Sequence, residues 1–401
     1  MAAMDHHTSK YGITRNVFVM GLVSFFNDVA SEMVYPIIPI FLTAFLGTSV
    51  AIVGIIEGIA ESTSSILKVI SGWLSDRSQK RKPFVIAGYA FSVLSKLLLA
   101  AAYSWHFVLA ARFVDRFGKG TRTSARDALI TESTPENNRG KAFGFHRTLD
   151  TLGAVVGPLF ALLLLSFTAN NMRLIFFIAF FPGLIGLLLL VIFVRESKHI
   201  KLDRKAVTFK YADLSYSFKV FLFISIIFAI GNSSDAFLIL RAQNLGLSVT
   251  LTVFAYVIFN LAYAVFSFPA GMISDKIGPR IVIAGGFFIF AIVYLLFGLI
   301  NHSAYLWILF PIYGLYMALT EGIGKAYISC LISPEKSGTA FGIYQTTIGF
   351  CAFFASFLAG MLWTQVNSRA PFIFGCITAV VSAMIFLIFE KRTRIINSNQ
   401  V

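Results

Sequence analysis

Apolar residues run along this chain in twelve long segments, and a short polar connection separates each from the next. A helix that crosses a bilayer needs about 20 predominantly apolar residues, and every segment is long enough. The pattern predicts an all-α polytopic membrane protein with twelve transmembrane helices. The segments cover roughly residues 14–45, 49–75, 83–103, 106–133, 140–167, 172–194, 216–241, 249–274, 280–300, 304–331, 338–363 and 370–390.

The composition agrees with a membrane protein. Of 401 residues, 57% are hydrophobic and 13% are charged, whereas charged residues make up about a quarter of a soluble domain. A net charge of +14 would suggest nucleic acid in a soluble protein, but here Lys and Arg alternate between the two sides of the predicted membrane. The opposite side carries Arg173, Arg369 and little more, so the positive-inside rule places both termini in the cytoplasm. We expect the chain in the cytoplasmic (inner) membrane. The basic side receives the amino terminus, residues 77–82, Arg139 with Lys141, residues 195–219, Lys276 with Arg280, Lys336 and residues 391–394.

The two halves of the chain resemble each other. GWLSDRSQKRKPFVIAG at 72–88 recurs as GMISDKIGPRIVIAG at 271–285, and TPENNRGKAFG at 134–144 is echoed by SPEKSGTAFG at 333–342. An offset of about 200 residues with six segments per half indicates parallel repeats related by an axis along the membrane normal. We therefore expect a six-helix bundle over residues 1–194, a cytoplasmic linker over 195–215, and a second six-helix bundle over 216–401.

These repeated loops resemble the signature loop of the major facilitator superfamily, and the resemblance covers essentially the whole chain. It implies two pseudo-symmetric bundles, with the first and fourth helix of each bundle lining a central cavity. It also implies that the two loops act as cytoplasmic latches; a basic turn that only fixes topology is the alternative for the first. The gating residues carried over onto these loops are Gly72, Asp76, Arg77, Gly271 and Asp275.

The segment 106–133 carries a basic stripe. At about 100° per residue, five basic side chains fall within an arc of roughly 120°, and Asp115 lies on the same arc. Charges facing lipid cost several kcal/mol each, so the stripe must face protein or water. Arg112 occupies the arginine position of the family, while Asp115 and Arg116 replace its Gln-Gly. The substrate candidates on this stripe are Arg112, Asp115, Arg116 and Lys119; Arg122 and Arg126 are candidates for the gate.

An anionic solute and a buried ion-pair network both explain such a stripe. In the network, Glu32, Glu57, Glu61 and Asp150 would consume the positive charge. Otherwise these groups are free to carry protons: carboxylates a turn apart repel each other in a low dielectric, and histidine titrates near neutral pH. The proton-coupling candidates are Asp28, Glu32, Glu57, Glu61, His146, Arg147 and Asp150.

Polar residues elsewhere are fewer. Asn27 in the first segment, Asn232 and Asp235 in the seventh, and Glu321 in the tenth complete the candidates for substrate binding. Gly153, Gly157 and Pro158 fit the family's antiporter-type motif, although small residues also simply let helices approach closely. Cys330, Cys351 and Cys376 have no metal-binding spacing and are expected in the core.

These features predict a proton-coupled secondary transporter of a small organic anion that works by alternating access. Polycarboxylates and citrate-type siderophores are examples of that class. No nucleotide-binding motif occurs, and no nucleophile–base spacing indicates an enzyme; we expect no cofactor, no metal, no nucleic acid and a monomer. A proton-driven multidrug or metabolite exporter is the alternative, and a non-transporting sensor on the same scaffold is a third.

Overall fold

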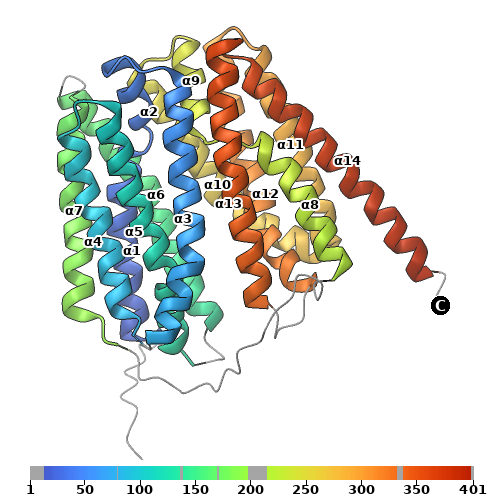
Figure 1. Ribbon diagram of the computed structural model, residues 1–401, viewed down its shortest axis with the longest axis horizontal. Coiled ribbons are helices and arrows are strands. Elements are labelled where there is room, and N and C mark those ends of the chain that lie inside the picture. The colour runs from blue at the N-terminus through green and yellow to red at the C-terminus, as the bar shows by residue number, and fades with distance from the viewer. Residues whose placement is uncertain are drawn as a thin grey trace, which may run out of the picture. The chain divides into compact units, whose positions relative to one another are not determined.

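The computed structural model describes residues 13–78, 80–135, 139–168, 171–196, 215–331 and 337–398, and every regular element in those ranges is a helix. The first half contains α1 (Arg15–Val34), α2 (Ile38–Ile40), the π-helix η1 (Phe41–Phe45), α3 (Val50–Ser78), α4 (Lys82–Ala100), α5 (Trp105–Glu132), α6 (Arg139–Phe167) and α7 (Met172–Phe193). The second half contains α8 (Tyr216–Gly231), α9 (Ala236–Asn244), α10 (Val249–Ile277), α11 (Pro279–Leu299), the 3₁₀-helix η4 (Ser303–Tyr305), α12 (Leu306–Leu331), α13 (Ser337–Gln365) and α14 (Ala370–Ser398) (Figure 1).

The predicted all-α membrane fold is confirmed. Within the described ranges, eleven spans are long and apolar enough to cross a membrane. The twelfth predicted span is α5, which falls outside that group because it carries the basic stripe. Most of the predicted linker, residues 197–214, lies outside the described residues.

Local sequence signals explain where several helices begin and end. The side chains of Thr14 and Ser248 cap α1 and α10. Each side-chain oxygen accepts a hydrogen bond from the backbone N–H three residues further along the chain, which satisfies one of the free donors of the first turn. Gly278 has φ +92° and is the one residue between α10 and α11, a conformation that favours glycine because it has no Cβ. Pro36 lies in the turn after α1, where proline ends a helix by removing a hydrogen bond.

The seventh span is interrupted. The sequence predicts a membrane-spanning segment over 216–241, and within it α8 ends at Gly231 and α9 begins at Ala236. The four residues between them are Asn, Ser, Ser and Asp, whose short polar side chains compete for backbone hydrogen bonds and favour helix ends. The predicted span is therefore present, and its helix is interrupted at residues 232–235.

Two compact units make up the chain: residues 1–47 with 59–205, and residues 48–58 with 206–401. In the first unit α1 packs on α6 and α7, and α4 packs on α5 and α7. In the second unit α8 packs on α13 and α14, and α11 packs on α12 and α14. The same four pairings thus occur in both units, as parallel repeats require. The first nine residues of α3 belong with the second unit, the rest with the first.

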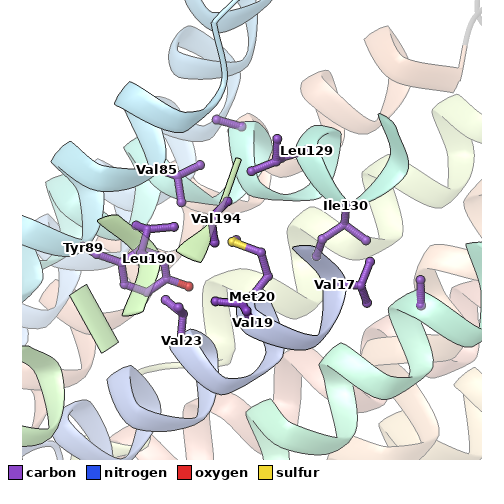
Figure 2. Close-up of a cluster of buried hydrophobic side chains, with 12 residues drawn as sticks. Val17, Val19, Met20, Val23, Val85, Tyr89, Leu129, Ile130, Leu190 and Val194 are labelled. Atoms are coloured by element: carbon purple, nitrogen blue, oxygen red, sulfur yellow. The ribbon is translucent and has the colours of Figure 1, made fainter. Parts of the chain in front are cut away.

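A cluster of buried apolar side chains holds the first unit together where α1, α4, α5 and α7 meet. Figure 2 shows Met20 of α1 at its centre, with Leu190 and Val194 at the end of α7 beside it. Tyr89 of α4 lies at one edge and is 1% exposed. This packing fixes the rotation of α5 about its axis, and that rotation determines the direction in which the face with the basic stripe points.

Candidate functional site

The basic stripe of α5 faces into the first unit. Arg112, Arg116 and Arg122 are 3%, 8% and 5% exposed, and Lys119 and Arg126 are half-buried. Because α5 is one unbroken helix of 28 residues, the five basic side chains keep the single face that the sequence predicts. Five cations on one buried face require anions, polar partners or a ligand to offset them.

Asp115 is held by the neighbouring helix. Its Oδ1 accepts a hydrogen bond from Lys96 of α4 at 2.7 Å and from Ser95 at 3.3 Å, and Arg112 lies 3.9 Å from its Oδ2. Lys96 also donates to Ser31 of α1 at 3.3 Å. The sequence gives one signal for this partner: Lys96 is an ionisable residue in the middle of an otherwise apolar span, and such residues find a partner inside the bundle.

Aromatic rings and a hydroxyl contact two further arginines. Arg122 donates to Ser92 at 2.5 Å, and its guanidinium carbon lies 4.5 Å from the ring centroid of Tyr89. The guanidinium of Arg112 lies 5.4 Å from the ring of Tyr35. Both distances are those of cation–π contacts, so each of these two arginines is held in place by protein.

Arg116 and Lys119 lie one turn apart on the stripe. Arg116 is 3.2 Å from Glu61 of α3, whose side chain is 40% exposed. One turn on, the half-buried ammonium of Lys119 makes no hydrogen bond or ion pair with any described residue. Lys119 lies near the charges of Arg116, Glu61 and Asp28. The ammonium of Lys119 is a strong hydrogen-bond donor for which no described residue supplies an acceptor.

A second polar group joins α1 to α6. Asp150 accepts hydrogen bonds from Ser24 at 2.6 Å and from Arg147 at 3.1 Å, and its carboxyl lies near that of Asp28. Asn27 donates to Asp28 at 3.2 Å. The sequence groups Arg147 with Asp150, but the pairing of two carboxyl groups from different spans is decided by packing.

Two glycines of α6 allow this approach. A Cβ on Gly153 would lie 2.6 Å from the carbonyl oxygen of Phe25 and 3.0 Å from Cβ of Asp28. A Cβ on Gly157 would lie 2.6 Å from the carbonyl oxygen of Val29, and 3.1 Å from Cβ of Glu32. The glycine motif therefore has a structural use: it brings the acidic face of α1 directly against α6.

His146 is the predicted titratable group with the least support from protein contacts. It is 5% exposed, and its Nε2 has no hydrogen-bond partner among the described residues. The charges of Arg126, Asp127, Asp150 and Arg147 surround it. Of these, Arg126 pairs with its neighbour Asp127 at 2.9 Å.

The remaining predicted site residues lie in the second unit. Asn232 donates to the hydroxyl of Tyr316 at 3.1 Å, and the hydroxyl of Tyr313 donates to Asp235 at 2.7 Å. Glu321 is exposed and accepts a short hydrogen bond from Tyr263. Glu57 is 1% exposed and accepts a hydrogen bond at 3.2 Å from Ser234, so one of its partners is a hydroxyl of the seventh span.

The predicted latch loops are described in part. The side chains of Asp76 and Asp275 lie outside the described residues. A Cβ on Gly72 would lie against Ser124 of α5, whereas a Cβ on Gly271 would meet no described atom within 4 Å. The guanidinium of Arg77 lies over the ring of Trp73 at 5.5 Å.

Sequence reasoning missed a polar network beside the first loop. Arg81 pairs with Glu132 at 3.1 Å and donates to Ser75 at 2.7 Å, and Glu196 accepts the backbone N–H groups of Arg81 at 2.8 Å and Lys82 at 3.0 Å. Arg81 stands in the repeated basic run, but nothing in the sequence says which acid it meets.

Known proteins are similar to this chain in sequence and in fold. The sequence profile of the Major Facilitator Superfamily matches residues 20–240 and 220–401. An uncharacterised MFS-type transporter of Methanocaldococcus jannaschii is 36% identical over 381 residues, which are 94% of this chain and 95% of that one. The multidrug resistance protein MdtG of a Rahnella species is 26% identical over 284 residues, 67% of this chain and 68% of that one.

A solved structure has the same fold. A POT family transporter in complex with 5-aminolevulinic acid has a TM-score of 0.80 and 14% identity, over 96% of this chain and 98% of that chain. At that identity the likeness concerns the fold alone. The sequence profile matches both halves of the chain, and the helix pairings recur in both units. The chain therefore belongs to the Major Facilitator Superfamily of membrane transporters.

Proposed function

We propose that this transporter moves a small organic anion across the cytoplasmic membrane, coupled to protons, by alternating access of its two units. The observation that carries the proposal is the unused ammonium of Lys119 beside Arg116 on the buried face of α5. A lysine and an arginine offer charge-assisted hydrogen bonds to a carboxylate, and the arginine fork can make two at once. A solute with two or more carboxylates fits this pair best.

In this proposal the substrate competes with Glu61. Arg116 keeps Glu61 as its partner until an anion arrives, because a buried guanidinium without an anion is costly. Arg112 supports the site from its place against Tyr35 and Asp115. We assign Asp115 a structural role, since Lys96 already holds it, and we keep Asn232 and Glu321 as candidates for the solute's polar groups.

Proton coupling is proposed for the carboxyl pair of Asp28 and Asp150. Two carboxyl groups that lie near each other repel when both are charged, and one shared proton relieves the repulsion. Because the pair joins α1 to α6, loss of that proton would loosen the packing of the two helices. Glu32, Arg147 and His146 lie close enough along the same helices to complete a proton route, while Glu57 and Glu61 are held by Ser234 and Arg116.

The orientation of the chain in the membrane is proposed from the positive-inside rule. We propose that both termini are cytoplasmic and that the two repeated loops close the cytoplasmic side. Arg122 and Arg126 belong to the same closing region, together with the network of Arg81, Glu132 and Glu196.

Proton-driven efflux of drugs or metabolites is the second candidate. It is favoured by the glycine motif of α6 and by the similarity to a protein named for multidrug resistance. In that case Asp28 and Glu61 would attract a cationic solute, and Lys119 would not contact it.

Transport into liposomes that contain a pH-sensitive dye separates the two candidates. We expect proton movement with di- and tricarboxylates and not with cationic drugs. Lys119→Ala should raise KM about 10- to 100-fold, because a hydrogen bond to a charged group contributes on the order of 1.5–3 kcal/mol. Asp28→Asn should abolish proton movement. Lys325→Ala, which removes an exposed ammonium from α12, is the matched control and should leave transport unchanged.

Two results would contradict the anion proposal. One is proton movement driven by cationic drugs that Lys119→Ala leaves intact, which would favour efflux. The other is binding of a carboxylate without any flux, which would indicate a sensor.

A further inference from the structure

The seventh span is interrupted near its middle, within the second unit. α8 ends at Gly231 and α9 begins at Ala236, so that residues 232–235 lie outside regular helix. Inside a membrane, the polar groups of an interrupted helix must be satisfied by protein, by water or by a bound ion. The groups that these four residues present therefore indicate what kind of ligand belongs there.

Four backbone hydrogen-bond donors around the start of α9 are already used. The N–H of Ser234 donates to the hydroxyl of Ser356 at 3.2 Å, and the N–H of Ala236 donates to the hydroxyl of Ser234 at 3.3 Å. The N–H groups of Phe237 and Leu238 donate to carbonyl oxygens within the break. An anion at the start of α9 would need such donors and would find these four occupied.

Oxygen atoms at the break are left over. Ser233 is 6% exposed and Tyr294 is 0% exposed, and neither hydroxyl makes a hydrogen bond of good geometry with the described part of the chain. The two hydroxyls lie close to each other and to that of Tyr313, which in turn donates to Asp235 at 2.7 Å. Buried polar atoms without partners are rare and indicate a bound water or ion.

The charge at the break selects a cation. Asp235 brings a carboxylate, and Ser233 and Tyr294 bring neutral oxygens. Ca²⁺ takes about six to eight oxygen ligands and Mg²⁺ keeps several waters in an octahedral shell, and within the described ranges no three His, Cys, Asp or Glu residues are grouped to hold a metal ion. A single carboxylate with neutral hydroxyls matches an ion of one positive charge.

We propose that the break in the seventh span binds one monovalent cation between oxygen atoms of Ser233, Asp235 and Tyr294. Tyr313 is a positioning residue that holds the carboxylate by its hydrogen bond. Asp235 is then a ligand of the ion and does not contact the organic substrate. Because α8 and α9 meet at this point, a bound ion sets the angle between them.

Thermal unfolding of the purified full-length protein tests the site with Na⁺ as the probe. NaCl is titrated against choline chloride at constant chloride, since choline is too large for a site of three oxygens. An ion that binds only the folded state raises its melting temperature, so the melting temperature should rise with Na⁺. Ser233→Ala and Tyr294→Phe should each weaken the apparent Na⁺ affinity about tenfold or more, and Asp235→Asn should abolish the response.

Tyr89→Phe is the matched control. It also removes a buried hydroxyl that has no partner among the described residues, but from the first unit, and its Na⁺ response should equal that of the wild type. The proposal is overturned if the wild type does not respond to Na⁺, or if Tyr294→Phe keeps the full response. Should a variant fail to fold, binding of radioactive Na⁺ to the wild type decides the matter. No organic substrate is present, so the result is independent of the proposed anion transport.

Discussion

The ammonium nitrogen of Lys96 lies 2.7 Å from Oδ1 of Asp115 and joins α4 to α5 inside the first unit. The two side chains are 3% and 11% exposed. Ser95 donates to the same oxygen, and Lys96 reaches on to Ser31 of α1. One ion pair therefore ties three helices together, and it removes Asp115 from the groups available to a solute.

Breaking this pair should destabilise the protein. Lys96→Met leaves a buried carboxylate with Arg112 at 3.9 Å and Arg116 nearby, and loss of one partner of a buried pair costs about 3–5 kcal/mol. We expect a clear fall in the melting temperature of the purified protein. The double variant Lys96→Met/Asp115→Leu should lose less than the two single variants added together. Strict additivity would show that the two charges do not stabilise one another.

Gly153→Ala should both destabilise the protein and impair proton movement. Its Cβ would lie 2.6 Å from a backbone oxygen of Phe25, so α1 must move away from α6, and overpacking of this kind costs about 1–3 kcal/mol. The movement would separate Asp28 from Asp150. Gly322→Ala is the control, because nothing lies within 4 Å of its Cβ. Equal melting temperatures for the two variants would show that α1 and α6 are not in close contact.

Glu196→Ala should loosen the first turn of α4. The carboxylate accepts the N–H groups of Arg81 and Lys82, and loss of such a cap costs about 1 kcal/mol. That energy corresponds to roughly fivefold faster opening, which hydrogen–deuterium exchange can measure on peptides that begin near residue 82. Peptides from the start of α11 serve as the internal reference. Unchanged exchange at α4 would mean that the carboxylate does not cap this helix.

Arg241→Lys should be strongly destabilising. The guanidinium donates to the carbonyls of Phe297 and Ile300 and to the side chains of Asn244 and Ser368, and the residue is 3% exposed. An ammonium cannot reach acceptors spread over that fork, and each buried acceptor left without a donor costs about 1–3 kcal/mol.

Thermal unfolding measures this effect. Arg369→Gln, which affects an exposed hydrogen bond to Asn301, should change the melting temperature little. A lysine variant as stable as the wild type would contradict the structural role of the fork.

The twelve spans could be predicted because each depends on a stretch of neighbouring residues. The apolar length of a span and the cap at Thr14 are local properties, and so is the glycine turn at Gly278. The break at residues 232–235 had a local signal too, a run of four short polar residues, but the apolar length around it outweighed that signal.

The candidate site was predictable only as a set of residue types. The five bases of α5 share a face because of helix geometry, and the structure keeps that face buried. Their partners were open, since Glu61 and Glu57 lie one turn apart on α3, yet Glu61 contacts Arg116 on α5 and Glu57 contacts Ser234 between α8 and α9. Lys96, Glu132 and Glu196 were passed over because each is a single charge with no pattern around it.

The sequence by itself determined the class of protein, the places where the chain crosses the membrane, and the repeat of its two halves, because these follow from hydrophobic length and from internal similarity. Only the tertiary structure decided which charges meet. A helix can rotate by a fraction of a turn at little cost in its own backbone, but that rotation exchanges one side-chain partner for another. Packing at close contacts such as Gly153 against Phe25 fixes the rotation. It thereby places Asp28 beside Asp150 and leaves Lys119 without a protein partner among the described residues.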